Sequence, residues 1–178
     1  EHLLIVEGGA DHDADWGQAI GYVGRIALLL PRPQRNAALP RLAQLLGCAS
    51  LDLLPVVGNP LGSWVYSHDH PLLRRVAEAG IWGHLQDGLV PEVAVRGLSW
   101  NTIVGACAIA ACTPYGPAIP QFGTSLALGE IGSTEVLLCT LPIAHRLAPR
   151  VPPDSDPPNQ NPGAETLLSN VAQWLAKG

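Results

Sequence analysis

Residues Gly123–Thr140 read Gly-Thr-Ser-Leu-Ala-Leu-Gly-Glu-Ile-Gly-Ser-Thr-Glu-Val-Leu-Leu-Cys-Thr, and their pattern predicts a β-hairpin. Leu126 and Leu128 alternate with small residues, which is the pattern of a strand with one apolar face. Gly132-Ser133 has the chemistry of a tight turn, and the apolar run 136–139 that follows is typical of a buried strand. We therefore expect the second strand of the hairpin to lie inside a sheet.

On the N-terminal side of this hairpin, predicted strands alternate with predicted amphipathic helices. Apolar runs predict strands at 2–7, 25–30 and 51–57, and helical periodicity predicts helices at 13–24 and 36–47, each ending at a glycine. Strands separated by helices pair in parallel through helical crossovers. This half of the chain therefore predicts an α/β fold with a mostly parallel sheet.

The remainder of the chain is less regular. It predicts a short strand at 64–66, a short helix opening at His70-Pro71, and strand-like runs at 89–95 and 101–111. A loop rich in proline, asparagine and aspartate covers 151–162, and an amphipathic helix begins near Pro162-Gly163 and covers the sheet. We therefore expect a mixed sheet, antiparallel near the C-terminus, in a single α/β domain over residues 1–178.

Composition excludes two classes of partner. With 178 residues, of which 47% are hydrophobic, the chain can bury one sizeable core. Its longest apolar runs fall far short of the roughly 20 residues needed to cross a bilayer. The net charge is −5 and the basic residues are scattered, so no basic patch for nucleic acid is formed. We expect neither a membrane nor a nucleic-acid partner, and the compartment, cytoplasm or secreted, stays open.

The four cysteines, Cys48, Cys107, Cys112 and Cys139, lie in apolar surroundings and are expected to be buried free thiols. Around Cys107, the run 105–109 resembles the strand-turn-helix elbow that exposes a nucleophile. The second glycine of that motif is replaced by Ile109, and no base with an orienting carboxylate is evident downstream. We therefore interpret Cys107 as structural and assign no catalytic residue.

Two histidine-containing clusters are candidates for polar chemistry. Asp11-His12-Asp13 follows the first strand, at the edge of the sheet where α/β proteins tend to bind ligands, although a solvated loop with a helix cap explains it as well. His68-Asp69-His70 could offer two imidazoles to a metal, but it lacks a third ligand and His70 is placed to begin a helix. Gly8-Gly9 lacks the third glycine of a dinucleotide turn. We expect no metal and no cofactor.

Three tryptophans, Trp64, Trp82 and Trp100, fall in the irregular middle of the chain. Exposed indole rings there would stack on a sugar face or on a partner domain, whereas buried rings would be ordinary packing residues. We take these tryptophans, together with Asp11, His12 and Asp13, as the candidate binding residues.

Several motifs follow one another in a characteristic order. They are a strand-Gly-Gly-helix-Gly-strand unit over 3–30, His70-Pro71-Leu72-Leu73 leading to Ile81-Trp82 and Asp87-Gly88, the hairpin, and the terminal helix with Leu167-Leu168-Ser169-Asn170. This order resembles the class I glutamine-amidotransferase-like domain, in the non-catalytic form appended to large bacterial glycoside hydrolases. The resemblance covers nearly the whole chain. It implies a three-layer α/β/α, flavodoxin- or amidotransferase-like domain without the Cys-His-Glu set of amidotransferases.

The chain departs from this family at its start, because such domains generally carry a strand-helix-strand portion before the strand at 2–7. We expect that portion to be missing or supplied by another chain. Two hypotheses follow. One is a non-catalytic accessory domain that contacts other domains of the same enzyme, a partner subunit or carbohydrate. The other is a small hydrolase or amidotransferase-like enzyme using Cys107 or the Asp11-His12-Asp13 loop.

Overall fold

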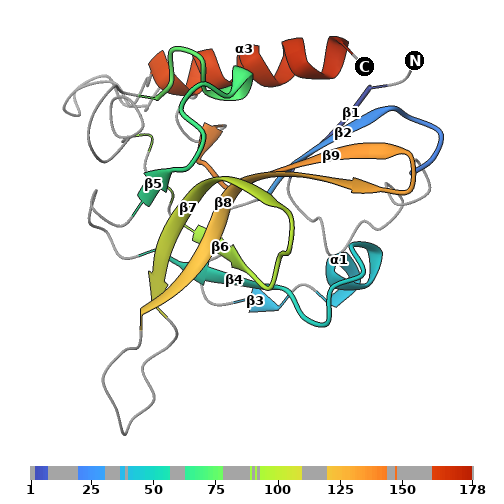
Figure 1. The fold of residues 1–178 in the computed structure, drawn as a ribbon, viewed down its shortest axis with the longest axis vertical. Coiled ribbons are helices and arrows are strands. Elements are labelled where there is room, and N and C mark those ends of the chain that lie inside the picture. The colour runs from blue at the N-terminus through green and yellow to red at the C-terminus, as the bar shows by residue number, and fades with distance from the viewer. Residues whose placement is uncertain are drawn as a thin grey trace, which may run out of the picture.

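The computed structural model describes residues 3–7, 20–30, 37–38, 40–56, 63–77, 89, 91, 93–109, 120–143, 147 and 162–177. Over these residues the strands are β1 Leu3–Glu7, β2 Arg25–Leu29, β3 Ala37–Ala38, β4 Asp52–Pro55, β5 Ser63–Val65, β6 Val93–Arg96, β7 Asn101–Ile109, β8 Pro120–Ile131 and β9 Thr134–Cys139. The helices described are α1 Pro40–Leu45, the 3₁₀ helix η3 Pro71–Leu73 and α3 Pro162–Ala176. The strands form one mixed sheet, so the prediction of an α/β-type fold with a mixed sheet is confirmed (Figure 1). The expectation that the sheet is mostly parallel is wrong: among the described strands only β1–β2 and β2–β9 pair in parallel, and the other pairings are antiparallel.

The parallel part of the sheet contains the first two predicted strands. β1 pairs in parallel with β2, and β2 pairs in parallel with β9. The middle residues of β2 and nearly all of β9 are buried. Because these strands are apolar on both faces, they occupy the interior of the sheet rather than an edge.

The hairpin forms as predicted. β8 and β9 are antiparallel, and Ile131 faces Thr134 across the Gly132-Ser133 turn. Gly132 adopts φ +61°, a left-handed conformation that a residue without Cβ enters at little cost. β9 lies between β2 and β8 in the sheet, so the expectation that the second hairpin strand is interior is confirmed.

The antiparallel part corrects the predicted role of the strand at 51–57. That strand exists as β4, but it pairs antiparallel with β6 and β3 and does not extend the parallel set. A local apolar pattern predicts a strand without identifying its partner, and here packing against β6 decides the direction. The short strand predicted at 64–66 is observed as β5, and the run at 101–111 is observed as β7 as far as Ile109, where the described residues stop. The run at 89–95 forms a strand only from Val93, as β6, because Leu89 and Pro91 are not in a strand.

The predicted helix at 13–24 is wrong over its last residues. Residues 8–19 lie outside the described residues, but Ile20 and Val23 form an isolated β-bridge around a turn. Gly21 has φ +85°. The hydroxyl of Thr134 accepts a hydrogen bond from the Gly21 N–H at 2.8 Å and donates one to the Val23 carbonyl at 2.9 Å. These bonds to β9 replace the hydrogen bonds that a helix would have made.

The second predicted helix is shorter than expected. It begins at Pro40 as α1, because Ala37–Ala38 belongs to β3, and the chain leaves it through Gly47 at φ +65°. The terminal helix α3 begins at Pro162 as predicted.

The two faces of β2 and β9 have different helical covers. Ala27, Leu137 and Cys139 pack in one apolar cluster with the α3 residues Leu167, Val171 and Leu175. The alternate residues of the two strands, including Ile26 and Leu138, pack in a second cluster with Leu42 and Ala43 of α1. Side chains alternate across a strand, so this division puts α3 and α1 on opposite faces. Figure 1 shows them on opposite sides of the sheet.

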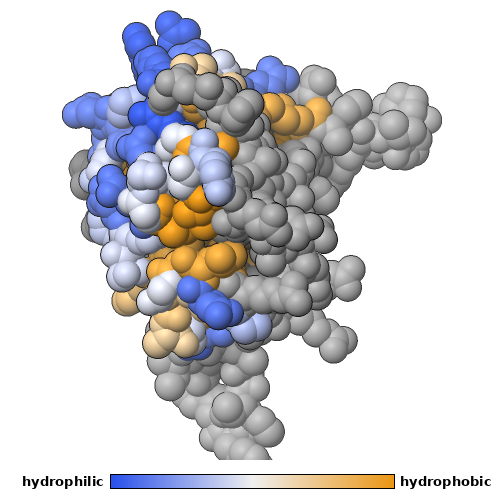
Figure 2. All heavy atoms as spheres, turned by 90° about the vertical axis from the view of Figure 1, so that its right-hand side faces the viewer, coloured by the Kyte–Doolittle hydropathy of each residue, from blue (hydrophilic) through white to orange (hydrophobic). Residues whose placement is uncertain are grey.

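Figure 2 looks at the side of the molecule on which the β8–β9 turn and α1 lie in Figure 1. Hydrophobic residues are visible in the middle of this side, next to a hydrophilic area. Several apolar side chains around the second cluster are half-buried rather than buried, among them Ile20, Leu45, Leu46 and Ile131. Within the described part of the chain, none of the helices is both long and apolar enough to span a membrane.

Candidate functional site

Three aromatic residues from two segments of the chain meet on the sheet. Trp64 of β5 contacts Tyr66, which follows that strand, and Phe122 of β8. Both contacts are edge-to-face, with ring centres 6.0 Å apart for Trp64 and Tyr66 and 5.4 Å apart for Trp64 and Phe122. We call Trp64, Tyr66 and Phe122 the aromatic surface.

The backbone pairing of β5 with β7 positions this surface. Trp64 pairs with Gly105, and a Cβ at Gly105 would lie 2.8 Å from both Trp64 Nε1 and Tyr66 Cε2. The missing side chain leaves the space that the two rings occupy. Val65, between them in sequence, is buried in the cluster that α3 covers, so Trp64 and Tyr66 point to the opposite face of β5.

The outer rings of the aromatic surface are accessible to solvent. Phe122 is 71% exposed and Tyr66 is 60% exposed, whereas Trp64 between them is half-buried. Large aromatic side chains in such positions favour stacking on an apolar ring or on the C–H face of a sugar, and the tyrosine hydroxyl adds a hydrogen-bonding group. Adjacent exposed aromatic rings are typical of a binding surface rather than of an inert one.

Trp100 has a different environment from Trp64. A Cβ at Gly129 would lie 2.1 Å from Trp100 Cδ2, so the indole is packed directly on the backbone of β8. Trp100 is half-buried against the cluster that α1 covers. The structure does not bring it to the aromatic surface, and its packing is that of a structural residue. Trp82, the third predicted tryptophan, lies outside the described residues.

The polar loop Asp11-His12-Asp13 also lies outside the described residues. His70 of the second polar cluster is the N-cap of η3: its Nδ1 accepts a hydrogen bond from the Leu72 N–H at 3.3 Å, as expected for a helix start. Partial burial lowers the pKa of His70. Among the residues that the structure describes, no three histidine, cysteine or carboxylate side chains are grouped as metal ligands.

The three cysteines among the described residues differ in burial. Cys139 is buried, and this burial raises its pKa to about 12, which keeps it a thiol at neutral pH. Cys107 is half-buried in β7 and pairs with Phe122 of β8, so an extended strand and not an elbow surrounds it as far as Ile109. Cys48 is also half-buried, which departs from the expected burial, and Cys112 lies outside the described residues.

Sequence reasoning selected Trp64 but missed Tyr66 and Phe122. One signal was available: Tyr66 stands two residues after Trp64 in a predicted strand, so both side chains belong on one face. Phe122, the one phenylalanine of the chain, joins them only through the pairing of β7 with β8. Such pairing is a long-range property that the local sequence does not contain.

Comparisons with family models, with curated proteins and with solved structures each find no match to this chain.

Proposed function

We propose that this chain is a non-catalytic accessory domain of a larger carbohydrate-active enzyme, and that it contacts carbohydrate through the aromatic surface. The observation that carries the proposal is the pair of exposed rings, Tyr66 and Phe122, on either side of the half-buried Trp64. A stacking platform of this kind binds sugar rings without a catalytic group.

The proposal includes the finer fold, a three-layer α/β/α arrangement of the flavodoxin and amidotransferase type. It is supported by the parallel order of β1, β2 and β9 and by the packing of α3 and α1 on opposite faces of β2 and β9. An accessory role is also consistent with Cys139, whose raised pKa makes it a poor nucleophile.

The test is binding of neutral hexasaccharides, namely cellohexaose, xylohexaose and maltohexaose, followed by calorimetry and by tryptophan fluorescence. We expect at least one to bind, and the double variant Y66A/F122A to bind it roughly thirtyfold more weakly, at about 1 kcal/mol for each ring. Tyr22→Ala is the matched control, because Tyr22 is 86% exposed and lies away from the aromatic contacts. Failure of all three sugars to bind, or equal weakening by Y22A, would refute carbohydrate contact at this surface.

The alternative is a small hydrolase or amidotransferase-like enzyme that uses Cys107. One observation supports this alternative. Cys107 is half-buried and pairs with Phe122 across β7 and β8, which places its thiol beside the aromatic surface. Alkylation of the folded protein with iodoacetamide at pH 7 separates the two hypotheses. The accessory domain predicts no selective labelling of Cys107, whereas rapid labelling that is abolished by Cys107→Ser favours the enzyme. Cys139 serves as the buried reference thiol in the same sample.

A further inference from the structure

We propose that a groove beside α3 binds a small polyhydroxylated molecule that carries a carboxylate or phosphate group. The groove has a volume of about 440 Å³. Arg74 and Arg75 line one side of it, and the α3 residues Glu165, Ser169, Asn170 and Gln173 line the other. We call it the arginine groove. Figure 1 shows the green segment that contains η3 running alongside α3.

Asn170 fixes the two sides of the groove to each other. Its side-chain amide donates hydrogen bonds to the carbonyl oxygens of Leu72, at 3.0 Å, and Arg74, at 2.9 Å. Leu72 and Leu73 are buried beneath this turn in the cluster that also holds Val171 of α3. The turn is therefore fixed both by apolar packing and by the hydrogen bonds of one amide, so the groove is preorganised for a ligand.

Arg75 adopts a backbone conformation that arginine does not favour. Its φ is +63°, in the left-handed region that glycine and asparagine enter more readily. Glycine would relieve the strain, yet the chain carries a guanidinium at this position. Strain that the surrounding contacts maintain is commonly found where a side chain is held for binding.

The charges of the arginine groove favour an anion. Both arginines are exposed, and no carboxylate of the described residues forms an ion pair with either guanidinium. Glu165 contributes one negative charge, so the groove keeps an excess of one positive charge in a chain whose net charge is −5. Guanidinium groups bind carboxylate and phosphate oxygens through paired N–H donors.

The other polar groups specify the rest of the ligand. Ser169, Gln173 and Glu165 offer a hydroxyl, an amide and a carboxylate on successive turns of one helix face, with Gln173 Nε2 already 3.5 Å from Ser169 Oγ. These groups donate to and accept from hydroxyls. The volume lies within the range of small-molecule sites, and the chemistry fits an acidic sugar or a sugar phosphate. This site is separate from the aromatic surface and does not rest on the function proposed for it.

The experiment titrates the chain with glucuronate, glucose 6-phosphate and neutral glucose, followed by NMR of the arginine Nε–H and glutamine side-chain amide signals. We expect one or both anions to bind and glucose not to bind. The anion that binds more tightly identifies the group as carboxylate or phosphate. Failure of both anions to bind, or equal binding of glucose, would overturn the proposal.

Variants locate the binding. Arg75→Gly should lower the affinity for the anion at least tenfold, because it removes the guanidinium. It should preserve or raise the melting temperature, because it also removes the backbone strain. Arg74→Gln, which leaves the backbone unchanged, should also lower the affinity for the anion. Arg96→Gln removes the same charge from the exposed pair with Asp52 on β4 and should leave the affinity unchanged. Equal losses in all three variants would mean that net charge, not the groove, attracts the anion, and the proposal would be wrong.

Discussion

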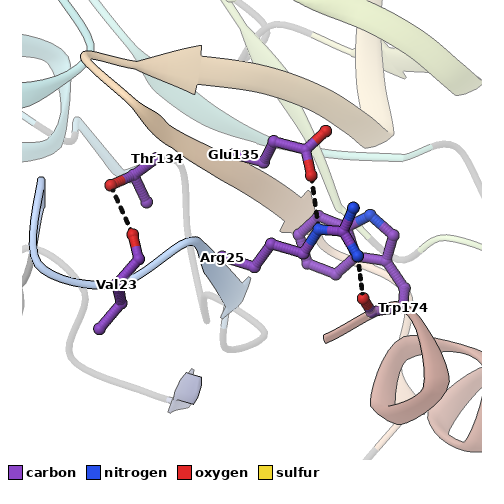
Figure 3. A network of polar contacts seen from close by, with 5 residues as sticks. All are labelled: Val23, Arg25, Thr134, Glu135 and Trp174. Atoms are coloured by element: carbon purple, nitrogen blue, oxygen red, sulfur yellow. Dashed lines mark hydrogen bonds and ion pairs between the residues drawn. The ribbon is translucent and has the colours of Figure 1, made fainter. Parts of the chain in front are cut away.

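The guanidinium of Arg25 lies over the indole ring of Trp174, with its central carbon 5.1 Å from the ring centre. Arg25 begins β2 and Trp174 is near the end of α3, so this contact joins a central strand to the terminal helix. The same guanidinium donates hydrogen bonds to the Glu135 carboxylate on β9 and to the Trp174 carbonyl oxygen (Figure 3). One side chain therefore fixes the helix end to two neighbouring parallel strands.

Replacing Arg25 with methionine should lower the free energy of unfolding by about 1–3 kcal/mol, because a charge-assisted network and a cation–π contact are lost together. The measurement is urea denaturation. Arg96→Met is the matched control: the Arg96 side chain is 45% exposed against 19% for Arg25, and its surface pair with Asp52 should be worth less than about 1 kcal/mol. Equal losses in the two variants would contradict the structural role of Arg25.

Thr134 should be sensitive to loss of its hydroxyl. It is fully buried at the start of β9, where its hydroxyl donates to the Val23 carbonyl (Figure 3). The same hydroxyl accepts a hydrogen bond from the Gly21 N–H. Thr134→Val keeps the shape, leaves the buried Val23 carbonyl without its donor and removes the acceptor of the exposed Gly21 N–H, at a cost of about 1–3 kcal/mol. Thr134→Ser keeps both hydrogen bonds and should cost clearly less. Indistinguishable unfolding midpoints for the two variants would rule out this account.

Gly129 should not tolerate a side chain. A Cβ there would lie 2.1 Å from the Trp100 ring, so Gly129→Ala should destabilise the protein by about 1–3 kcal/mol through forced repacking. Gly24→Ala is the control, since nothing lies within 4 Å of its added Cβ. Denaturation of both variants, with the tryptophan fluorescence of the first compared with that of the wild type, checks the prediction. A stable G129A protein with unchanged fluorescence would disprove the packing of Trp100 on β8.

The sequence predicted those helices and strands that a short stretch of the chain specifies by itself. The hairpin of β8 and β9 combines strand alternation with a glycine turn, and α3 carries an apolar stripe, so both could be found without knowledge of the rest of the chain. The pairing direction of β4 could not be predicted from its sequence, because its apolar run fits a parallel or an antiparallel strand. Contact with β6 determines that the pairing is antiparallel. The Ile20–Val23 turn depends on Thr134, more than a hundred residues away.

The candidate sites likewise combine residues that the local sequence can identify with features that depend on long-range contacts. Trp64 could be selected by residue type, but the exposure of Tyr66 and Phe122 follows from the face of the sheet on which each falls. The arginine groove is harder still to predict. In the sequence, Arg74-Arg75 is an ordinary pair of surface residues. No sequence pattern predicts the positive φ of Arg75 or the hydrogen bonds from Asn170.

The N-cap of η3 predicts a pH dependence of stability. His70 Nδ1 accepts the Leu72 N–H, and burial lowers the pKa of His70 from its ordinary value of 6.5. The unfolded chain therefore binds a proton at a higher pH than the folded chain. Below pH 6.5 the unfolded state holds more protons, so the contribution of His70 is fully present above that pH and is lost as the pH falls through the lower, folded pKa.

Urea denaturation of the wild type and of His70→Asn between pH 5 and pH 8 measures this contribution. Asparagine also caps helices and does not titrate, so H70N should remove part of the loss of stability on acidification while keeping the cap. His68→Asn, which replaces the neighbouring exposed histidine and leaves the N-cap in place, is the matched control for the substitution itself. A slope in H70N equal to that of the wild type, or a stability that rises as the pH falls below 6.5, would mean that His70 does not couple protonation to folding.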